Sequence, residues 1–149
     1  MNPGNEIEIQ TMKSKAKVYL SGPIFTLGEI AWAGKIKAEI EERLCERLGV
    51  FWPYEISAGS KEEVYRENIR SLDGCDLLVA ILDVPQVNDG IAWERGPHVA
   101  KGRKVLGVRT DLRRAGEFRS SRVNAMIESS CIRVKDSEEL LAELERLLR

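Results

Sequence analysis

The sequence predicts a single three-layer α/β domain built around a five-stranded parallel sheet. Short β-prone runs alternate along the chain with segments in which apolar residues recur at helical spacing, as in doubly wound folds. One run, Leu77–Leu82, is apolar without alternation and is flanked by Asp76 and Asp83. Such a segment is typical of a central parallel strand, because helices cover both of its faces. The length of 149 residues fits one domain of this kind and is too short for two ordinary ones.

The expected elements follow one another regularly from residue 17. Strands are expected at residues 18–20, 50–52, 77–82, 105–108 and 132–134. The first helix is marked by apolar residues at every fourth position, namely Ile36, Ile40, Leu44 and Leu48. Gly49 follows this stripe and is expected to end the helix.

Two further helices are defined by their charged and apolar residues. The segment 61–73 is highly charged and is expected to turn Val64, Ile69 and Leu72 toward the core. The last helix is expected to open at Asp136, which starts a capping-box pattern before a leucine-rich run.

The composition is that of a globular domain with balanced charge. Hydrophobic residues make up 43% and charged residues 32%, and 23 basic residues against 24 acidic ones give a net charge of −1. This balance argues against a nucleic acid polymer or an anionic membrane as the main partner. The longest apolar run is roughly a third of what a membrane span needs.

The chain is divided into a tail and one domain. Residues 1–15 show no periodicity and no signal-peptide pattern, and are expected to be a frayed or disordered tail ahead of a domain at 16–149. The three cysteines are odd in number and widely spaced, which favours neither a disulfide framework nor a zinc site. A reduced, cytoplasmic protein is therefore expected.

Glu94 is the first candidate for chemistry, because ligands of α/β sheets bind at the carboxyl ends of the strands. Pro97 is tolerated best in a first helical turn, so a helix is expected to start near Trp93. Glu94 would then lie at the positive end of that helix, where the dipole favours an ionised carboxylate able to act as a nucleophile. The alternative is that Glu94 only caps the helix.

The single histidine and the loop at residues 21–25 exclude several kinds of catalytic or binding site. His98 is the only histidine, which excludes a Ser-His-Asp triad and a multi-histidine metal site, and it is expected on a helix surface or in an interface. The loop 21–25 has one glycine and no Lys-Ser/Thr pair, so it matches neither a dinucleotide fingerprint nor a P-loop. It is either a tight turn or a turn that brings Phe25 close to a flat ligand.

Several segments together resemble the nucleoside 2-deoxyribosyltransferase family. They occur in the family's order and spacing and comprise residues 18–25, Asp76, residues 89–96, residues 104–113 and residues 124–127. The resemblance implies a flavodoxin-like (Rossmann-like) domain that forms a homodimer or a higher homo-oligomer, in which a neighbouring subunit completes each active site. It also implies transfer of 2-deoxyribose between purine or pyrimidine bases through a covalent glycosyl-enzyme.

The resemblance assigns roles to individual residues. Glu94 corresponds to the nucleophile that attacks C1′ of the sugar, and Tyr19 to the hydroxyl that orients it. The expected substrate-binding residues that match family motifs are Gly22, Ile24, Phe25, Gly90, Asn124 and Met126. Among these, Asn124 resembles the residue that the adjacent subunit lends to the sugar 5′-hydroxyl. The ligands are deoxynucleosides and nucleobases, and no metal or organic cofactor is expected because retaining glycosyl transfer needs only a carboxylate and an acid.

Two positions depart from the family pattern. The family usually has an aspartate six residues before the nucleophile, which helps to protonate the base, whereas this chain has Asn88 there with Asp89 beside it. The family also tends to place a sugar-binding aspartate where this chain has Asn68, next to Glu67. Asn68, Asn88 and Asp89 are therefore counted with the substrate-binding residues, and base preference or rate can differ from typical members.

Two other functions stay open. A sibling branch hydrolyses deoxynucleoside 5′-monophosphates and binds the phosphate with small hydroxyl residues; Asn124 favours the transferase, while nearby Ser120 and Ser121 keep the N-glycosidase as the alternative. The third possibility is a nucleotide-binding module without catalysis, against which the pair of Tyr19 and Glu94 argues.

An apolar slot favours transfer over hydrolysis. Ile24, Phe25 and Met126 are expected to stack a second base and to exclude water from the glycosyl-enzyme.

Overall fold

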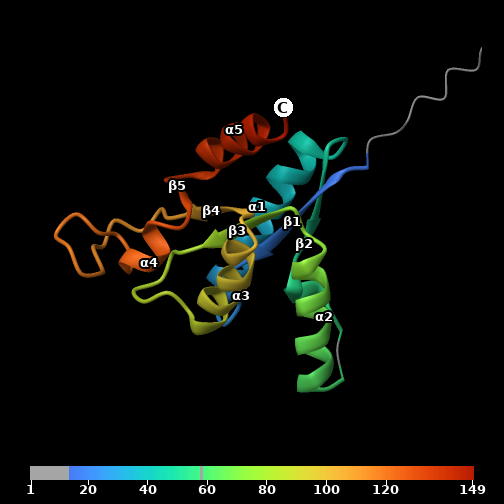
Figure 1. Cartoon of the computed structure of the whole chain (residues 1–149), viewed down its shortest axis with the longest axis horizontal. Helices are drawn as coiled ribbons and strands as arrows, with labels where there is room; N and C mark the ends of the chain where they lie inside the picture. Colours follow the sequence, from blue (N-terminus) through green and yellow to red (C-terminus); the bar gives the residue numbers. More distant parts are fainter. Residues whose placement is uncertain (1–13, 58) are drawn as a thin grey trace, which may run out of the picture.

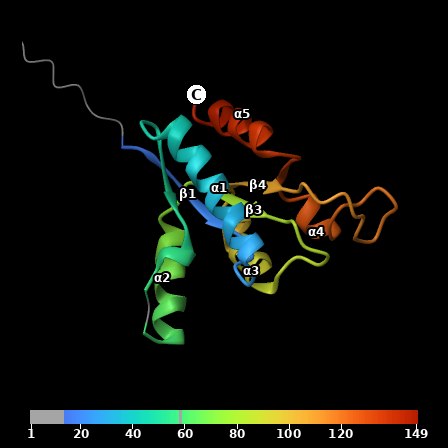
Figure 2. The same cartoon turned by 180° about the vertical axis from the view of Figure 1, so that it is seen from behind.

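A computed structural model describes residues 14–57 and 59–149 of the chain. The expected tail at residues 1–15 lies almost wholly outside the described residues. In the described part, one sheet is flanked by helices on both sides (Figures 1 and 2). The α/β fold class predicted from the sequence is confirmed.

The sheet has five parallel strands in the order β2-β1-β3-β4-β5. Their bounds are β1 Ala16–Ser21, β2 Leu48–Phe51, β3 Leu77–Ile81, β4 Lys104–Val108 and β5 Ile132–Val134. β3 lies in the middle, and all five of its residues are buried, as its unbroken apolar sequence predicts.

The helices divide the core into two layers, one on each face of the sheet. Their bounds are α1 Leu27–Leu44, α2 Lys61–Asp73, α3 Asp89–Ala100, α4 Ala125–Glu128 and α5 Ser137–Leu147, with a short 3-10 turn at Pro53–Glu55. Alternate residues of β3 serve the two layers: Leu77, Val79 and Ile81 pack with α1 and α5, whereas Leu78 and Ala80 pack with residues of α2, α3 and α4.

The first helix is shorter than its apolar stripe predicts. Ile36, Ile40 and Leu44 are buried on α1, but α1 ends at Leu44, and Leu48 begins β2 instead of continuing the helix. The apolar run 48–51 pairs in register with β1 from Ala16 onward, so strand pairing prevails over the helical period here.

The expected inward face of α2 is only partly correct. Leu72 is buried and Ile69 is half-buried, but Val64 is 44% exposed. The N-terminal half of α2 projects beyond the edge of the sheet in both views (Figures 1 and 2), so Val64 has no layer to pack against.

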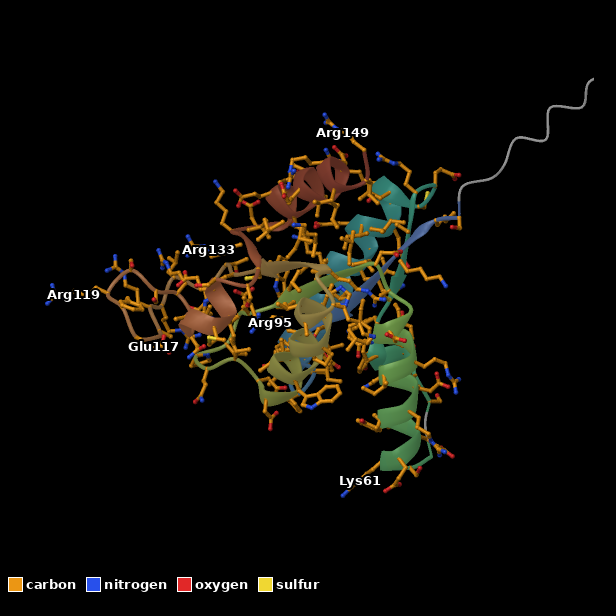
Figure 3. All side chains as sticks on the ribbon, viewed as in Figure 1. Lys61, Arg95, Glu117, Arg119, Arg133 and Arg149 are labelled. Atoms are coloured by element: carbon orange, nitrogen blue, oxygen red, sulfur yellow. The ribbon has the colours of Figure 1, made fainter. Side chains whose placement is uncertain are left out.

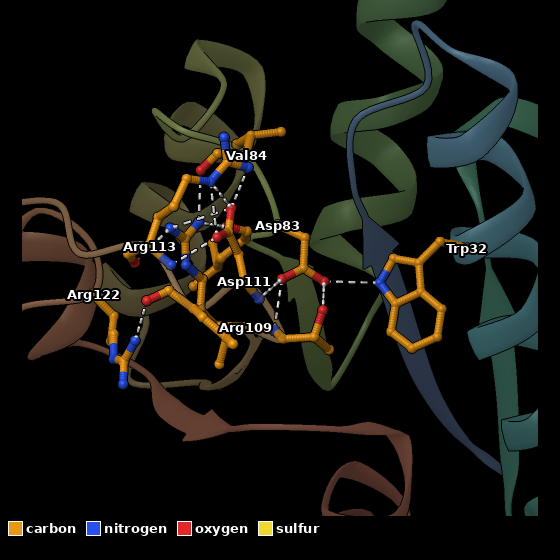
Figure 4. A network of polar contacts seen from close by, with 10 residues as sticks. Trp32, Asp83, Val84, Arg109, Asp111, Arg113 and Arg122 are labelled. Atoms are coloured by element: carbon orange, nitrogen blue, oxygen red, sulfur yellow. Dashed lines mark hydrogen bonds and ion pairs between the residues drawn. The ribbon is translucent and has the colours of Figure 1, made fainter.

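Asp83 organises the carboxyl edge of the sheet directly after β3. Its carboxylate accepts hydrogen bonds from Trp32 Nε1 on α1 at 2.9 Å, from the Thr110 amide at 2.6 Å and from the Asp111 amide at 2.9 Å (Figure 4). The Arg109 guanidinium is buried beside it and donates to the carbonyl oxygens of Leu82 and Val84. This network ties α1, β3 and the loop after β4 into one rigid edge.

Two further features concern membranes and metals. Within residues 14–57 and 59–149, no helix is long and apolar enough to cross a bilayer. In the same part of the chain, no three His, Cys, Asp or Glu side chains are grouped so that they could hold a metal ion.

The tight packing around Gly107 of β4 predicts that a larger residue there lowers stability. A Cβ at Gly107 would lie 2.8 Å from both Cys131 Sγ and Leu82 Cδ1, so Gly107→Ala overpacks the core and is expected to lower the free energy of unfolding by about 1–3 kcal/mol in urea denaturation. Gly34→Ala is the matched control, because a Cβ there makes ordinary contact with Trp52 and alanine favours α1 by up to about 1 kcal/mol. Equal midpoints for wild type and Gly107→Ala would show that β4 is packed differently.

Candidate active site

Glu94 lies at the centre of a partly buried polar cluster between α3 and β1. Tyr19 Oη donates a hydrogen bond to Glu94 Oε1 at 2.7 Å, and Ser21 Oγ donates to Glu94 Oε2 at 2.5 Å. Tyr19 is fully buried and Ser21 is 1% exposed. Both carboxylate oxygens are therefore held by hydroxyl donors that come from the same strand.

The alternation of β1 explains why these two hydroxyls reach the same carboxylate. Residues i and i+2 of a strand point to one face, so Tyr19 and Ser21 both face α3 while Val18 and Leu20 enter the opposite layer. Tyr19 was expected here from the family resemblance, whereas Ser21 was expected to belong to a turn. Ser21 is in fact the last residue of β1, and the i+2 spacing from Tyr19 is the signal that could have found it.

The predicted start of the helix that carries Glu94 was wrong. α3 begins at Asp89, with Asn88 as its cap, so Glu94 lies beyond the first turn and Pro97 lies inside the helix. The Asn88 side chain accepts hydrogen bonds from the amides of Gly90 at 2.8 Å and Ile91 at 3.4 Å, which fixes the earlier start. Pro97 has no backbone N–H to donate, so α3 lacks one internal hydrogen bond at this position.

The electrostatic reason given for an ionised Glu94 must also be corrected. Burial raises the pKa of Glu94 above its ordinary value, and the hydrogen bonds from Ser21 and then Tyr19 act in the opposite direction. The two hydroxyls, rather than the helix dipole, are thus the groups that favour the charged form. Burial and the neighbouring carboxylate raise the pKa of Tyr19 far above its ordinary value, so its hydroxyl stays a proton donor to Glu94.

A cavity of about 170 Å³ opens beside Glu94 at the carboxyl end of β1. It brings together most of the residues predicted for the site, namely Gly22, Ile24, Phe25, Asn68, Asn88, Gly90 and Glu94. Ser21, Trp52, Pro53 and Tyr54 also line it and were not predicted individually. Pro53 and Tyr54 follow β2 and so lie at the carboxyl end of the sheet, where ligands of α/β folds bind.

Gly22 is required by the close approach of the chain to β3. A Cβ at this position would lie 2.9 Å from Ile81 Cδ1, closer than real side-chain contacts allow. The glycine therefore lets the turn after β1 sit directly against the end of β3, and the cavity wall follows from that contact.

Asn68 reaches the cavity from α2. Its Oδ1 is buried and has no hydrogen-bond partner among residues 14–57 and 59–149. A second cavity of about 130 Å³ lies on its other side, between α2 and α3, and Asn68, Gly90 and Glu94 line both. A buried acceptor without a partner is costly, so Asn68 Oδ1 is available to a hydroxyl or amino group of a ligand.

Four predicted site residues do not line the cavity, and one of them, Tyr19, is fully buried and contacts Glu94. Asp89 is exposed in the first turn of α3. Asn124 caps α4 and donates to Glu117 at 2.5 Å, and Met126 is 76% exposed. Glu117 lies out along the loop before α4, well away from α2 (Figure 3). That Asn124 and Met126 serve the site of a neighbouring subunit stays a prediction.

His98 is not on the surface as expected. It is 1% exposed on the inner side of α3, and burial lowers its pKa below the ordinary value, which favours the neutral ring. His98 follows Glu94 by about one turn of α3, but it does not line the cavity at Glu94. It lines a separate cavity beside α2, together with Ile69 and Leu72.

Comparison with known proteins gives a family match over most of the chain. Residues 18–128 match the sequence model of the family described as nucleoside 2-deoxyribosyltransferase. The matched segment contains Tyr19, Ser21 and Glu94, together with every other residue that lines the cavity.

Solved structures share the fold at low sequence identity. A conserved protein from Enterococcus faecalis is 24% identical, with a TM-score of 0.77 over 91% of this chain and 100% of its own. A 2-deoxyribosyltransferase from Leishmania mexicana is 20% identical, with a TM-score of 0.72 over 87% of this chain and 96% of its own. A CMP N-glycosidase from Clostridium botulinum is also 20% identical, with a TM-score of 0.56 over 89% and 99% of the two chains.

The raised pKa of Glu94 predicts that this residue lowers stability at neutral pH. A carboxyl whose pKa is higher in the folded state stabilises the fold below its unfolded pKa, near pH 4, and loses that contribution as the pH rises through the folded value. Glu94→Gln keeps the shape and is expected to raise the free energy of unfolding at pH 7 by on the order of 1 kcal/mol.

The gain from Glu94→Gln should disappear below about pH 4, where glutamate is protonated in both states. Urea denaturation at several pH values measures this difference. Glu42→Gln, on the exposed side of α1, is the control and should follow the wild type throughout. A Glu94→Gln variant that is less stable at pH 7 would contradict the electrostatic account.

Proposed function

The chain belongs to the nucleoside 2-deoxyribosyltransferase family, and from this premise we propose that it transfers 2-deoxyribose between purine and pyrimidine bases through a covalent ester on Glu94. The observation that carries the proposal is the partly buried Glu94 carboxylate, which two hydroxyls hold at the wall of a cavity. A carboxylate in this setting is poised to act as a nucleophile rather than to serve as a surface charge.

The proposed reaction has two displacements at C1′. The Glu94 carboxylate attacks from the face opposite the base, the base departs, and a second base then attacks the ester from the first side, so that configuration is retained. Asn88 lines the cavity where the departing base would lie, but an amide can only hydrogen-bond the base and cannot protonate it. Proton delivery therefore falls to water or to another group.

Transfer rather than hydrolysis is favoured by the apolar wall of the site. Ile24 and Phe25 line the cavity, and exclusion of water by such side chains protects a glycosyl ester until an acceptor base arrives. Asn124 offers a neutral amide and no positive charge for a 5′-phosphate. We propose deoxynucleosides and free nucleobases as the ligands, without a metal or an organic cofactor.

Hydrolysis of deoxynucleoside 5′-monophosphates is the second candidate. The shared fold with the CMP N-glycosidase from Clostridium botulinum supports it, as do Ser120 and Ser121 in the loop before Asn124. A binding module without catalysis is the third, and the Tyr19–Glu94 pair argues against it, because a binder has no need of a buried nucleophile.

We also propose that the protein is at least a dimer with shared active sites. Ligand pockets usually measure roughly 300–1,000 Å³, more than the 170 Å³ beside Glu94, so one chain encloses only part of a nucleoside. Large exposed side chains surround the site, among them Phe25 at 73%, Tyr65 at 60% and Trp93 at 49%. A neighbouring chain that covers them would complete the walls and bury apolar surface.

The nucleophile is tested by Glu94→Gln and Tyr19→Phe. Loss of the attacking carboxylate is expected to lower the rate of base exchange by ~10³-fold or more. Tyr19→Phe removes one orienting hydrogen bond and should cost less, roughly 2- to 100-fold. Exchange at an unchanged rate in Glu94→Gln would dismiss the covalent mechanism.

The choice between the candidate functions is tested by the products. Deoxyinosine with cytosine is expected to give deoxycytidine, with only slow release of free base when no acceptor is present, as followed by chromatography. Base released mainly from deoxynucleoside monophosphates would instead support the N-glycosidase. If neither the nucleosides nor the monophosphates are turned over, the result would support the binding module without catalysis.

The shared site is tested by mixing two variants that are each impaired. Asn124→Asp keeps the cap of α4 but removes the amide donor, and Glu94→Gln removes the nucleophile. If a neighbour supplies Asn124, mixed oligomers contain sites with both native residues, and the mixture should be more active than the mean of its components. Light scattering should show an oligomer at micromolar concentration. A fully active monomer would rule out a shared site.

A further inference from the structure

The two oxygens of the Glu94 carboxylate are not equivalent. Oε1 accepts its hydrogen bond from Tyr19, which is fully buried and does not line the cavity. Oε2 accepts its hydrogen bond from Ser21, which lines the cavity together with Glu94. The carboxylate therefore has one oxygen directed toward the interior of the protein and one on the side of the cavity.

We propose that Glu94 Oε2 is the atom that attacks the sugar, and that Ser21 is the positioning residue that holds this oxygen until C1′ arrives. The proposal rests on the proposed function and deepens it, because it assigns separate roles to the two hydroxyls. Tyr19 holds Oε1 on the interior side of the carboxylate, and Ser21 holds Oε2 on the cavity side.

The chemistry of ester formation fits this division. As the bond from Oε2 to C1′ forms, the glycosidic bond breaks and its electron pair leaves with the base nitrogen, which takes a proton from water. The carbonyl double bond of the new ester then lies at Oε1, which remains a good acceptor for Tyr19. Oε2 becomes an ester oxygen and a poor acceptor, so the hydrogen bond from Ser21 is weakened.

The hydroxyls of Tyr19 and Ser21 differ in how freely they can move, as their separate roles require. The Tyr19 hydroxyl is fixed by its ring, which is buried and packs against Phe51 with ring centroids 5.4 Å apart. The Ser21 hydroxyl turns about a single side-chain bond and can leave Oε2 without disturbing the strand. The rigid Tyr19 hydroxyl thus stays bonded to Oε1, the carbonyl oxygen of the ester, and the movable Ser21 hydroxyl can leave Oε2 when it attacks.

The charge of Glu94 depends heavily on these hydroxyls. No ion pair reaches Glu94 within residues 14–57 and 59–149, and the next residue, Arg95, turns its guanidinium toward α4 (Figure 3), where it donates to Ser130. Of the titratable side chains on the neighbouring helix α2, Tyr65 lines the second cavity together with Glu94. Removal of Ser21's hydroxyl should therefore be felt directly by the carboxylate.

Kinetics of Ser21→Ala provide the first test. We expect kcat to fall roughly 10- to 100-fold with a much smaller change in KM. The acid limb of the pH–rate profile should move to higher pH, because loss of a donor raises the pKa of the carboxyl, so the deficit should shrink in alkaline buffer. Ser21→Thr keeps the hydroxyl and should restore most of the rate.

Two controls separate this proposal from a structural effect and from the proposed function. Ser71→Ala, at the end of α2 and away from the cavity, should leave both rate and pH profile unchanged. A titration of the Glu94 carboxyl by carbon NMR should show the same upward shift in Ser21→Ala without any turnover. If Ser21→Ala behaves like Ser71→Ala while Glu94→Gln is inactive, only the role of Ser21 fails. An active Glu94→Gln would overturn the proposed function itself.

A structure of the trapped ester identifies the attacking atom. Crystals soaked in deoxynucleoside without an acceptor base are expected to show C1′ bonded to Oε2, with Tyr19 still within hydrogen-bond distance of Oε1. C1′ bonded to Oε1 would overturn the proposal even if Glu94 carries the sugar.

Discussion

A partly buried carboxylate held by two hydroxyls from one strand is the interaction on which the site depends. Burial raises the pKa of Glu94 and so disfavours the charged, nucleophilic form, and the hydrogen bonds from Ser21 and Tyr19 act in the opposite direction. These two hydrogen bonds persist only if β1, which carries the donors, and α3, which carries Glu94, keep their relative position and orientation. β1 lies between β2 and β3 in the sheet, and the Asp83 network ties the end of β3 to α1, so the donors rest on a rigid frame.

The same constraint explains why stability and reactivity are opposed at this position. Desolvation of Glu94 destabilises the folded state at neutral pH, yet a desolvated carboxylate is the more effective nucleophile once a sugar lies in the cavity. Asn68 Oδ1 is a second cost of this kind, since no group in residues 14–57 or 59–149 hydrogen-bonds to it and a ligand could. Both features lie at the cavity and away from the two core layers, which is where functional strain is expected.

Much of the fold followed from local patterns, and the errors have physical causes. The apolar run at Leu77–Leu82 predicted the central strand because burial on both faces leaves no alternation. The start of α3 was misplaced because the rule for Pro97 was weighed above the capping ability of Asn88. His98 and Val64 were misassigned because burial depends on which elements lie opposite, and Ser21 was missed because its sequence resembles a turn. The approach of Ser21 to Glu94 joins residues 73 positions apart, which no local pattern reports.

The central claim is that Glu94 becomes covalently glycosylated, and mass spectrometry of the quenched protein tests it most directly. The chain is mixed with a deoxynucleoside in the absence of an acceptor base, stopped in acid and digested. The peptide carrying Glu94 is expected to gain the mass of one 2-deoxyribosyl group. Added free base should remove this mass, and Glu94→Gln should never acquire it. Full turnover with an unmodified Glu94 peptide at every time point, or the sugar on a different residue, would contradict the account.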